Sequence, residues 1–344
     1  MKANWRNVAL AVALFGGVAT ASNNGVGAVY GFDENAENGV AEVAAISEVG
    51  EKVKTSDAAS KPMFEKLVEL AEKDGRVYAV CEVCDGVSRT KQIRPASRSQ
   101  NTYSVAKLFA VTAVMILQDR GVLDVDDPVF PIFEEKFPEN FDPKWRDVKI
   151  SDVMKHRVGF ERGFLDIDAE NPNDWASQDY LRLVLERPLK YKPGEKSVYS
   201  DAAFYLVSRI VSEKTGERLD DFLIREVLAP AKFAECAFAK CPQGFPMGAT
   251  GMYISTEDMA KLGVIYVQRG VYGGKRILSE AAVDEVLKRG FELHPVGDSG
   301  FAFGKGGMRG QFLYINTKTK RVVAIHSCDA NLDEILGYLA KNDR

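Results

Sequence analysis

Hydrophobic positions fall into several distinct patterns near the start of this chain. From Phe64 to Gly75 the apolar residues recur with helical spacing. Two short alternating segments follow, VYAVCEVC and TKQIRP, and their alternation predicts two strands joined as a hairpin. The run from Ser104 to Arg120 carries a broad apolar stripe that ends at Gly121, a pattern typical of a buried helix.

The rest of the chain changes from helical to strand-like patterning. From about residue 122 to 240 the pattern is mostly helical, and DYLRLVLERP and AAFYLVSRIVSEKTG are its clearest helices. After residue 295, GQFLYINTKTKRVVAIHSC predicts two strands and LDEILGYLAK a final helix. Strands near both ends predict an α+β fold, in which helices flank an antiparallel sheet built from the N- and C-terminal parts and a mostly helical subdomain is inserted.

The N-terminus has the pattern of a targeting segment. Lys2 and Arg6 precede a short apolar stretch, Val8 to Val18, and then the small residues Ala19-Thr20-Ala21. This layout predicts a signal peptide at residues 1–21 and a secreted or cell-envelope protein, since the stretch is short for a membrane span. An uncleaved anchor and an ordinary N-terminus of a cytoplasmic protein are the alternatives. Residues 22–60, rich in Gly, Asn, Ala, Glu and Ser, predict a linker or loosely ordered arm, so the folded domain is expected at residues 61–344.

Composition limits the classes of function. The chain has 344 residues, of which 46% are hydrophobic and 27% charged, and its formal net charge is -4. These values are typical of a globular protein. Mild acidity gives no support to nucleic-acid binding, which would require a basic surface.

Five cysteines leave more than one interpretation open. Cys81 and Cys84 lie in a predicted strand, where positions i and i+3 point to opposite faces, so a zinc site shared with Cys236 and Cys241 would require a bulge. Small buried thiols are the favoured interpretation, and export would also allow a Cys236–Cys241 disulfide. We therefore expect no metal and no organic cofactor. Cys328 stands apart from both pairs.

Ser104 and Lys107 lie three positions apart at the start of the predicted buried helix. That spacing places both side chains on one face, with Ser104 where the free N–H groups and the helix dipole favour negative charge. Burial disfavours the ammonium form of Lys107, and a neutral amine can accept the proton of a neighbouring serine. For the pair alone, an N-capping serine beside a lysine that reaches solvent is the alternative.

Two further segments carry similar chemistry. Tyr199-Ser200-Asp201 leads into a predicted helix, and Lys305-Gly306-Gly307 lies at the mouth of a predicted strand. Taken singly, these residues are also explained as a core aromatic, a solvated turn lysine and a β-bulge.

With these motifs in this order, the sequence resembles the serine hydrolases of the β-lactamase and penicillin-binding-protein superfamily. The similar branch contains class C β-lactamases, D-alanyl-D-alanine carboxypeptidases, D-aminopeptidases and esterases, which carry S-x-x-K, then Y-x-N, then K-T-G or H-x-G. GVLDVDDPV, VKISDVMKHRVGF and MGATGMYISTEDMAKLG also look like family segments in family order, so the resemblance spans roughly residues 60 to 330. It implies a β-lactamase-like fold.

The resemblance also implies roles for the three motifs. Ser104 would attack the substrate carbonyl and become acylated, while Lys107 and Tyr199 would share the general-base work. Lys305 would supply positive charge near the phenol and hold a substrate carboxylate. His156, within VMKHRVG, is expected to be a structural residue of its loop.

The remaining implied roles concern the backbone. The N–H groups of Ser104 and Met308 would form the oxyanion hole. Gly306 and Gly307 would let substrate approach the strand closely, because neither has a Cβ.

Two departures from the family pattern affect the expected activity. Asp201 stands where the family often has Asn, and its carboxylate would pair with Lys107 and hold that lysine charged. Gly306 replaces the threonine whose hydroxyl β-lactam-recognising members use. The resemblance therefore implies a serine hydrolase that acts through an acyl-enzyme on small esters, amides or D-amino-acid peptides. A β-lactamase, or a non-catalytic homologue that binds peptidoglycan fragments or a partner, is the alternative.

Overall fold

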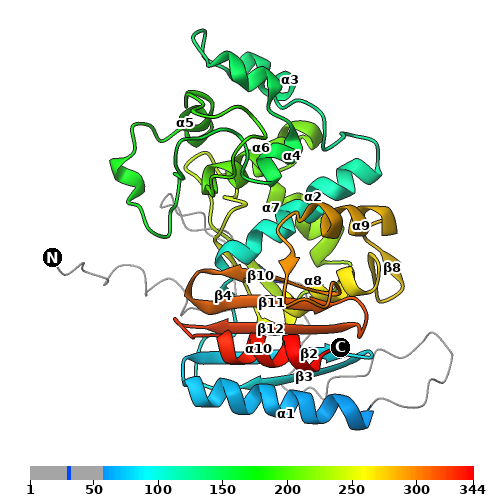
Figure 1. Cartoon of the computed structure of the whole chain (residues 1–344). Helices are drawn as coiled ribbons and strands as arrows, with labels where there is room; N and C mark the ends of the chain where they lie inside the picture. The colour runs from blue at the N-terminus through cyan, green and yellow to red at the C-terminus, as the bar shows by residue number, and fades with distance from the viewer. Residues whose placement is uncertain (1–28, 32–56) are drawn as a thin grey trace.

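The computed structural model describes residues 29–31 and 57–344 (Figure 1). The predicted signal peptide, residues 1–21, lies outside the described residues. Two pieces of the predicted linker are in regular structure: strand β1 (Val29–Gly31) and the beginning of helix α1 (Asp57–Asp74). Helix α1 therefore begins before the Phe64 start that the hydrophobic pattern predicts, and it ends as predicted just before Gly75.

A six-stranded antiparallel sheet joins the two ends of the chain, as predicted. Its order is β3-β2-β12-β11-β10-β9. The strands are β2 (Val77–Cys84), β3 (Val87–Gln92), β9 (His294–Pro295), β10 (Ala302–Gly307), β11 (Gln311–Asn316) and β12 (Arg321–Ser327). All residues of β12 are buried, because this central strand is covered on both faces.

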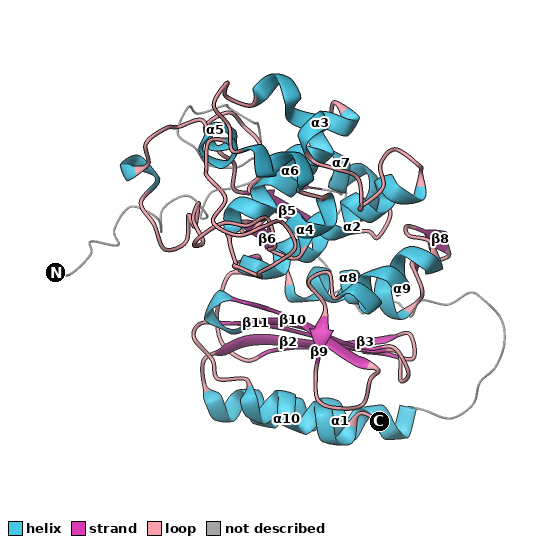
Figure 2. Ribbon diagram, turned by 45° about the horizontal axis from the view of Figure 1, so that its top comes forward, coloured by secondary structure: helices cyan, strands magenta, loops and turns pink. Residues whose placement is uncertain are grey.

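Helices cover both faces of the sheet (Figure 2). Helices α1 and α10 (Asp333–Asn342) lie on one face, and α8 (Thr256–Val267) and α9 (Glu280–Arg289) lie on the side of the other face. Gly263 allows α8 to sit closely on the sheet, since a Cβ added there would lie 2.5 Å from Cγ1 of Val322. The helix–sheet–helix layering confirms the predicted α+β class.

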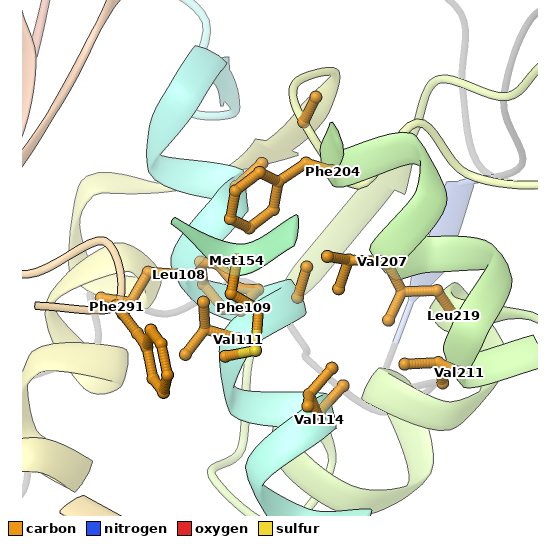
Figure 3. Close-up of a cluster of buried hydrophobic side chains, with 14 of the residues drawn as sticks. Leu108, Phe109, Val111, Val114, Met154, Phe204, Val207, Val211, Leu219 and Phe291 are labelled. Carbon is orange, nitrogen blue, oxygen red and sulfur yellow. The ribbon is translucent and has the colours of Figure 1, made fainter. Parts of the chain in front are cut away.

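The remaining helices lie farther from the sheet than α8, and α2 (Ala106–Asp119) runs beside α9 (Figure 1). They are α2, α3 (Phe130–Phe133), α4 (Ile150–Met154), α5 (Tyr180–Leu185), α6 (Asp201–Thr215) and α7 (Leu219–Leu223). Every residue of α2 from Ala106 to Leu117 is buried, so the helix runs through the middle of this group of helices. Figure 3 shows its apolar side chains meeting those of α6: Leu108, Phe109, Val111 and Val114 on α2, and Phe204, Val207 and Val211 on α6.

Two small sheets have no counterpart in the hydrophobic pattern. The first has the order β1-β5-β6-β4 and includes β4 (Gln100–Asn101), β5 (Glu235–Phe238) and β6 (Met252–Ile254). The second pairs β7 (Val271–Tyr272) with β8 (Lys275–Arg276). The first sheet holds the chain just before Ser104, because Thr102 donates hydrogen bonds to Met252 O from its N–H at 2.8 Å and its hydroxyl at 3.0 Å.

All five cysteines are free thiols, so the Cys236–Cys241 disulfide considered for an exported protein is not formed. Cys241 instead accepts a hydrogen bond from the Tyr205 hydroxyl of α6 at 3.4 Å, whereas Cys236 lies on β5. Burial raises the pKa of Cys81 to about 11, which keeps its thiol protonated. Within residues 57–344, no helix is both long enough and apolar enough to cross a membrane.

Candidate active site

Ser104 lies in a 3-10 turn, Tyr103–Val105, that immediately precedes α2. The hydrophobic pattern predicts a helix that starts at Ser104, two residues before α2 begins. Ser104 nevertheless lies at the N-terminal end of the helix, as predicted. Tyr103 has a φ of 46°, a left-handed conformation that is uncommon for residues with a side chain. Its N–H donates to Asn101 Oδ1 at 2.9 Å, and this bond helps to hold the sharp turn before the serine.

Lys107 is fully buried, and its ammonium donates three hydrogen bonds. The acceptors are Ser104 Oγ at 3.0 Å, Asp201 Oδ1 at 2.7 Å and the Ala249 carbonyl at 2.9 Å. An ammonium group has three donors. The side chain is thus completely satisfied as a cation.

The charge of Lys107 is set by Asp201. Burial alone would lower the pKa of Lys107, but the Asp201 carboxylate and then Tyr199 outweigh it, so this pKa is raised above its ordinary value. The neutral amine expected from burial alone is therefore not the resting form. Asp201 is itself buried at the first position of α6, which leaves its carboxylate committed to this pair.

Tyr199 brings the second motif to the serine. Its hydroxyl donates a hydrogen bond to Ser104 Oγ at 2.7 Å, and 53% of the residue is exposed. Two ammonium groups flank its ring, with Lys107 Nζ 4.8 Å and Lys305 Nζ 5.7 Å from the ring centroid. Negative charge on the phenol oxygen would therefore meet a favourable field.

Strand β10 places the third motif beside the serine turn. A Cβ added at Gly307 would lie 2.5 Å from the Thr102 carbonyl oxygen and 3.2 Å from Ser104 N, so the two backbones touch there. At Gly306 the nearest atom to an added Cβ is 3.6 Å away, an ordinary contact. Of the two glycines in the third motif, only Gly307 is required for the close approach of β10 to the serine turn. Met308 follows directly and is largely exposed, so the residue expected to complete the oxyanion hole lies at the same edge.

Lys305 is buried and has a partner within the chain. Its Nζ lies 2.5 Å from Glu292 Oε2. Burial alone would raise the pKa of Glu292, but Lys305 and His156 lower it to about 2. A substrate carboxylate, which the resemblance assigns to Lys305, would therefore compete with Glu292. No motif pointed to Glu292, because a lone Glu in FELHP has no pattern around it.

His156 also lies against the site and does more than shape its loop. Its Nδ1 accepts a hydrogen bond from the Ser200 N–H at 3.2 Å, and its Nε2 lies 3.1 Å from Glu292 Oε1. Because Nδ1 accepts, Nε2 carries a proton and donates to the Glu292 carboxylate. The His156 and Tyr199 ring centroids are 4.3 Å apart.

Three carboxylates gather next to Lys107. Oxygens of Asp166, Asp168 and Asp201 all lie within 4.8 Å of one another. Asp201 is bound to Lys107, and Asp168 Oδ2 accepts from the Thr250 hydroxyl at 2.5 Å. Burial, together with the neighbouring carboxylates Asp201 and Asp166, raises the pKa of Asp168 despite that hydrogen bond. Asp166 Oδ1 accepts a hydrogen bond from the Asp168 N–H at 3.0 Å, so each of the three carboxylates has a hydrogen-bond partner within the chain.

Known proteins are similar in sequence to large parts of this chain. A family model described as Beta-lactamase matches residues 73–339, a segment that contains every site residue named above. N-acetylmuramyl-L-alanine amidase of Bacillus subtilis (strain 168) is 27% identical over 198 residues, which cover 53% of this chain and 44% of the amidase. A putative D-alanyl-D-alanine carboxypeptidase of Escherichia coli (strain K12) is 29% identical over 174 residues, which cover 46% of this chain and 38% of the relative. The chain thus spans less than half the length of these relatives.

One solved structure illustrates the shared fold. A putative 6-aminohexanoate-dimer hydrolase from Bacillus anthracis aligns over 80% of both chains, with a TM-score of 0.68 and 17% sequence identity. At that identity the likeness is one of fold.

Proposed function

Because the chain belongs to the beta-lactamase family, whose members are hydrolases, we propose that it is a serine hydrolase that forms an acyl-enzyme on Ser104. The observation that carries the proposal is the surroundings of Ser104 Oγ, which lies 2.7 Å from Tyr199 Oη and 3.0 Å from Lys107 Nζ. A serine hydroxyl becomes a strong nucleophile when a neighbouring group takes its proton. Two ionisable groups are within reach of this one.

Tyr199 is the proton acceptor in this proposal. The Lys107 ammonium uses all three of its donors and its pKa is raised, so it has no lone pair to offer. For this step the Tyr199 hydroxyl, which donates to Ser104 in the structure, first releases its proton to solvent. Its phenolate then takes the proton of Ser104, beside the Lys107 and Lys305 ammonium groups. Lys107 remains charged and stabilises the serine oxygen as it attacks.

The acyl group of the substrate is then transferred to Ser104 and afterwards to water. Ser104 Oγ forms a bond to the acyl carbon, and the oxygen of the tetrahedral intermediate lies at the N–H groups of Ser104 and Met308. The bond to the leaving alcohol or amine breaks, and that group receives the proton from Tyr199. A water molecule hydrolyses the ester on Ser104 and restores the serine, with Tyr199 again carrying the proton.

Small esters, amides and D-amino-acid peptides are the proposed substrates. The names of the similar amidase and carboxypeptidase support cleavage of amide bonds in cell-wall material. With the signal-like N-terminus, they also support a secreted or envelope location. β-Lactam hydrolysis has less support, since Gly306 lacks the threonine hydroxyl of β-lactam-recognising members.

A fluorophosphonate probe tests the nucleophile directly. Wild-type protein is expected to become labelled, and Ser104→Ala is expected to lose the label while remaining folded. Ser197→Ala is the matched control, because Ser197 is exposed and its hydroxyl bonds only to the Lys155 carbonyl among the described residues. A folded but unlabelled wild-type protein that still binds muropeptides would instead indicate a non-catalytic binding protein.

A substrate screen follows from a positive label. Rates with p-nitrophenyl esters, D-alanyl-D-alanine peptides and nitrocefin compare the three proposed or alternative acyl donors. Turnover of nitrocefin in preference to the other two would contradict the proposed substrate class.

A further inference from the structure

Three buried polar side chains lie behind Tyr199, and the steps above do not explain why they are there. Glu292 is 2% exposed, Lys305 5% and His156 7%. The Glu292 carboxylate joins the other two, since its Oε2 lies 2.5 Å from Lys305 Nζ and its Oε1 lies 3.1 Å from His156 Nε2. The carboxylate is thus shared between the Lys305 ammonium and the His156 ring.

Burying this group is costly for the fold. An ammonium and a carboxylate lose their hydration when buried, and their mutual attraction often only offsets that loss. Apolar side chains of similar size would stabilise such a position at least as well. Ionised Glu292 is nevertheless strongly favoured, because Lys305 and His156 overcome burial and lower its pKa to about 2. Stability alone therefore gives a poor account of the arrangement.

Both partners of Glu292 contact the same tyrosine. Lys305 Nζ lies 5.7 Å from the centroid of the Tyr199 ring. The His156 ring lies 4.3 Å from Tyr199, centroid to centroid, and its Nδ1 accepts the N–H of Ser200, the residue that follows Tyr199. One carboxylate thus controls a charge beside the phenol and a contact to its ring and backbone.

The backbone indicates that this geometry is imposed by its surroundings. His156 and Glu292 both have left-handed φ angles, 55° and 62°. Residues with side chains adopt this region at a cost, and such conformations persist where the surrounding contacts determine them. Two of them face each other across one hydrogen bond here.

We propose that Glu292 is a positioning residue of the active site: its carboxylate holds the Lys305 ammonium and the His156 ring against Tyr199 and thereby sets the position and the charge environment of the phenol oxygen. The inference rests on the proposed function, in which Tyr199 exchanges a proton with Ser104. In this inference the positive charge of Lys305 acts on Tyr199.

Glu292→Gln isolates the charge. The amide oxygen of the variant still accepts the His156 Nε2–H, but its other end no longer offers a negative charge to Lys305. If the wild type hydrolyses p-nitrophenyl acetate, we expect the kcat of Glu292→Gln to be about 10- to 100-fold lower, the scale of a disturbed acid-base group. Its KM should change by less than about threefold. The rising limb of the pH–rate profile should move to higher pH, because a buried lysine without a counter-charge is disfavoured as an ammonium, and a neutral amine at Lys305 would no longer stabilise the ionised phenol.

Glu292→Asp and Glu82→Gln are the matched comparisons. Asp restores the charge, so part of kcat and the wild-type pH limb should return. Glu82 lies on β2, away from the serine turn. It is also buried, and it forms an ion pair with Arg321. Its Gln variant should lose stability while its folded fraction keeps the wild-type kcat and pH profile. A Glu82→Gln profile shifted like that of Glu292→Gln would reduce the effect to general loss of stability and overturn the proposal.

A double-mutant cycle tests the route of action. If Glu292 acts through Lys305, Glu292→Gln should add less than about threefold to the loss caused by Lys305→Met alone. Fully multiplicative losses would overturn the assignment.

A spectroscopic measurement separates this inference from the proposed function. The chain has three histidines, so ¹⁵N spectra of histidine-labelled protein are readily assigned with His156→Asn. The wild-type protein should show His156 held with its proton on Nε2, and Glu292→Ala should release that tautomer. The signal of His326, which lies on β12 away from Glu292, should stay unchanged, whereas His294, whose pKa depends on burial and also on Glu292, is not used as a reference. An unaltered His156 signal overturns the proposal even if the protein hydrolyses nothing. Wild-type turnover with unchanged Glu292→Gln kinetics overturns it while leaving the serine hydrolase intact.

Discussion

Asp201 determines the charge of Lys107 in the candidate site. It is the strongest attractive partner of the Lys107 ammonium, which it meets at 2.7 Å, and it keeps the pKa of that fully buried lysine above its ordinary value. With a carboxylate here, the lysine serves as a fixed positive charge. The proposed mechanism therefore assigns the role of proton acceptor to Tyr199.

Tyr199→Phe should remove the acceptor and leave the fold intact. The hydroxyl lies at a half-exposed position, so its loss leaves no buried group without a partner. We expect turnover of a p-nitrophenyl ester to fall by about 10²-fold or more, as for loss of a positioned acid-base group. Steady-state kinetics and circular dichroism measure both parts. Unchanged turnover would remove Tyr199 from the mechanism.

Asp201→Asn should convert Lys107 into a second acceptor. Burial lowers the pKa of Lys107, and Asp201 is the main group that opposes it, so removing the carboxylate charge should lower this pKa. In the Tyr199→Phe background, Asp201→Asn is then expected to recover turnover by about tenfold at pH 8 to 9, the scale of one shifted group. Rates of the single and double variants decide the point. A double variant slower than Tyr199→Phe at all pH values would show that Lys107 does not take over.

At the scale of elements, the contact between β10 and the serine turn assembles the site. Ser104, the proposed nucleophile, comes from the segment between β4 and α2, and the third motif comes from a strand about two hundred residues later. Their backbones meet at Gly307 and Thr102 with no room for a Cβ. The spacing of the two segments is therefore set by a missing side chain.

Gly307→Ala should push β10 away from the serine. The new Cβ would lie 2.5 Å from a backbone carbonyl oxygen, which cannot rotate aside. We expect a loss of about 1–3 kcal/mol in the free energy of unfolding, typical of overpacking, together with a loss of turnover. Urea denaturation and ester kinetics measure the two effects.

Gly306→Ala is the matched control for stability. Its nearest neighbour would be 3.6 Å from the new Cβ, so its free energy of unfolding should stay near the wild-type value. Equal losses in the two variants would contradict the role of backbone contact at Gly307.

The sequence predicted those elements whose patterns are long and local. Helices α2 and α6 have 14 and 15 residues, enough turns for periodicity to be recognised, and β12 contains the apolar run VVAI. Strands β4 and β6, with 2 and 3 residues, are too short to show alternation. The left-handed Tyr103 depends on a bond to Asn101 that no spacing rule specifies.

Within the site, the motifs predicted which residues meet, and Asp201 in the second motif predicted that Lys107 is held charged, but not how far Asp201 outweighs burial. Ser104, Lys107 and Tyr199 lie within hydrogen-bond distance as the family spacing implied. The state of Lys107 depends on how burial and Asp201 compare, which requires coordinates. Glu292 and His156 come from unrelated loops and are joined only by the fold.

At the scale of the whole molecule, the central sheet contains a buried titratable group. His326 on β12 is fully buried, and its Nδ1 lies 2.7 Å from Gln311 Oε1 of β11. Burial lowers the pKa of His326 from 6.5 to about 4. In the unfolded chain this imidazole takes up a proton at higher pH than in the folded protein.

Stability should therefore fall on acidification through this window. The contribution of His326 is complete above about pH 6.5 and is lost as the pH falls toward 4, because the unfolded state binds the proton more tightly. The difference corresponds to about 3 kcal/mol at the lower limit. Urea denaturation between pH 4.5 and 7.5 measures it, and the pKa of Glu292, about 2, keeps that carboxylate ionised throughout the range.

His326→Asn supplies the comparison. The variant should be less stable at neutral pH but should show a flatter dependence on pH. His294, whose pKa burial also lowers, contributes in the same direction, so the difference between the two proteins isolates His326. Parallel curves for the wild type and the variant would show that the buried imidazole does not control acid stability.

The position of β12 between β2 and β11 has a consequence for biosynthesis. A nascent chain that has reached residue 310 already holds Ser104, Lys107, Tyr199 and Lys305. It still lacks the strand that bridges the early and the late parts of the sheet. Residues 321–327 must therefore be synthesised before β12 can join the two parts of the sheet, and a product that ends at residue 310 should lack the proposed hydrolase activity.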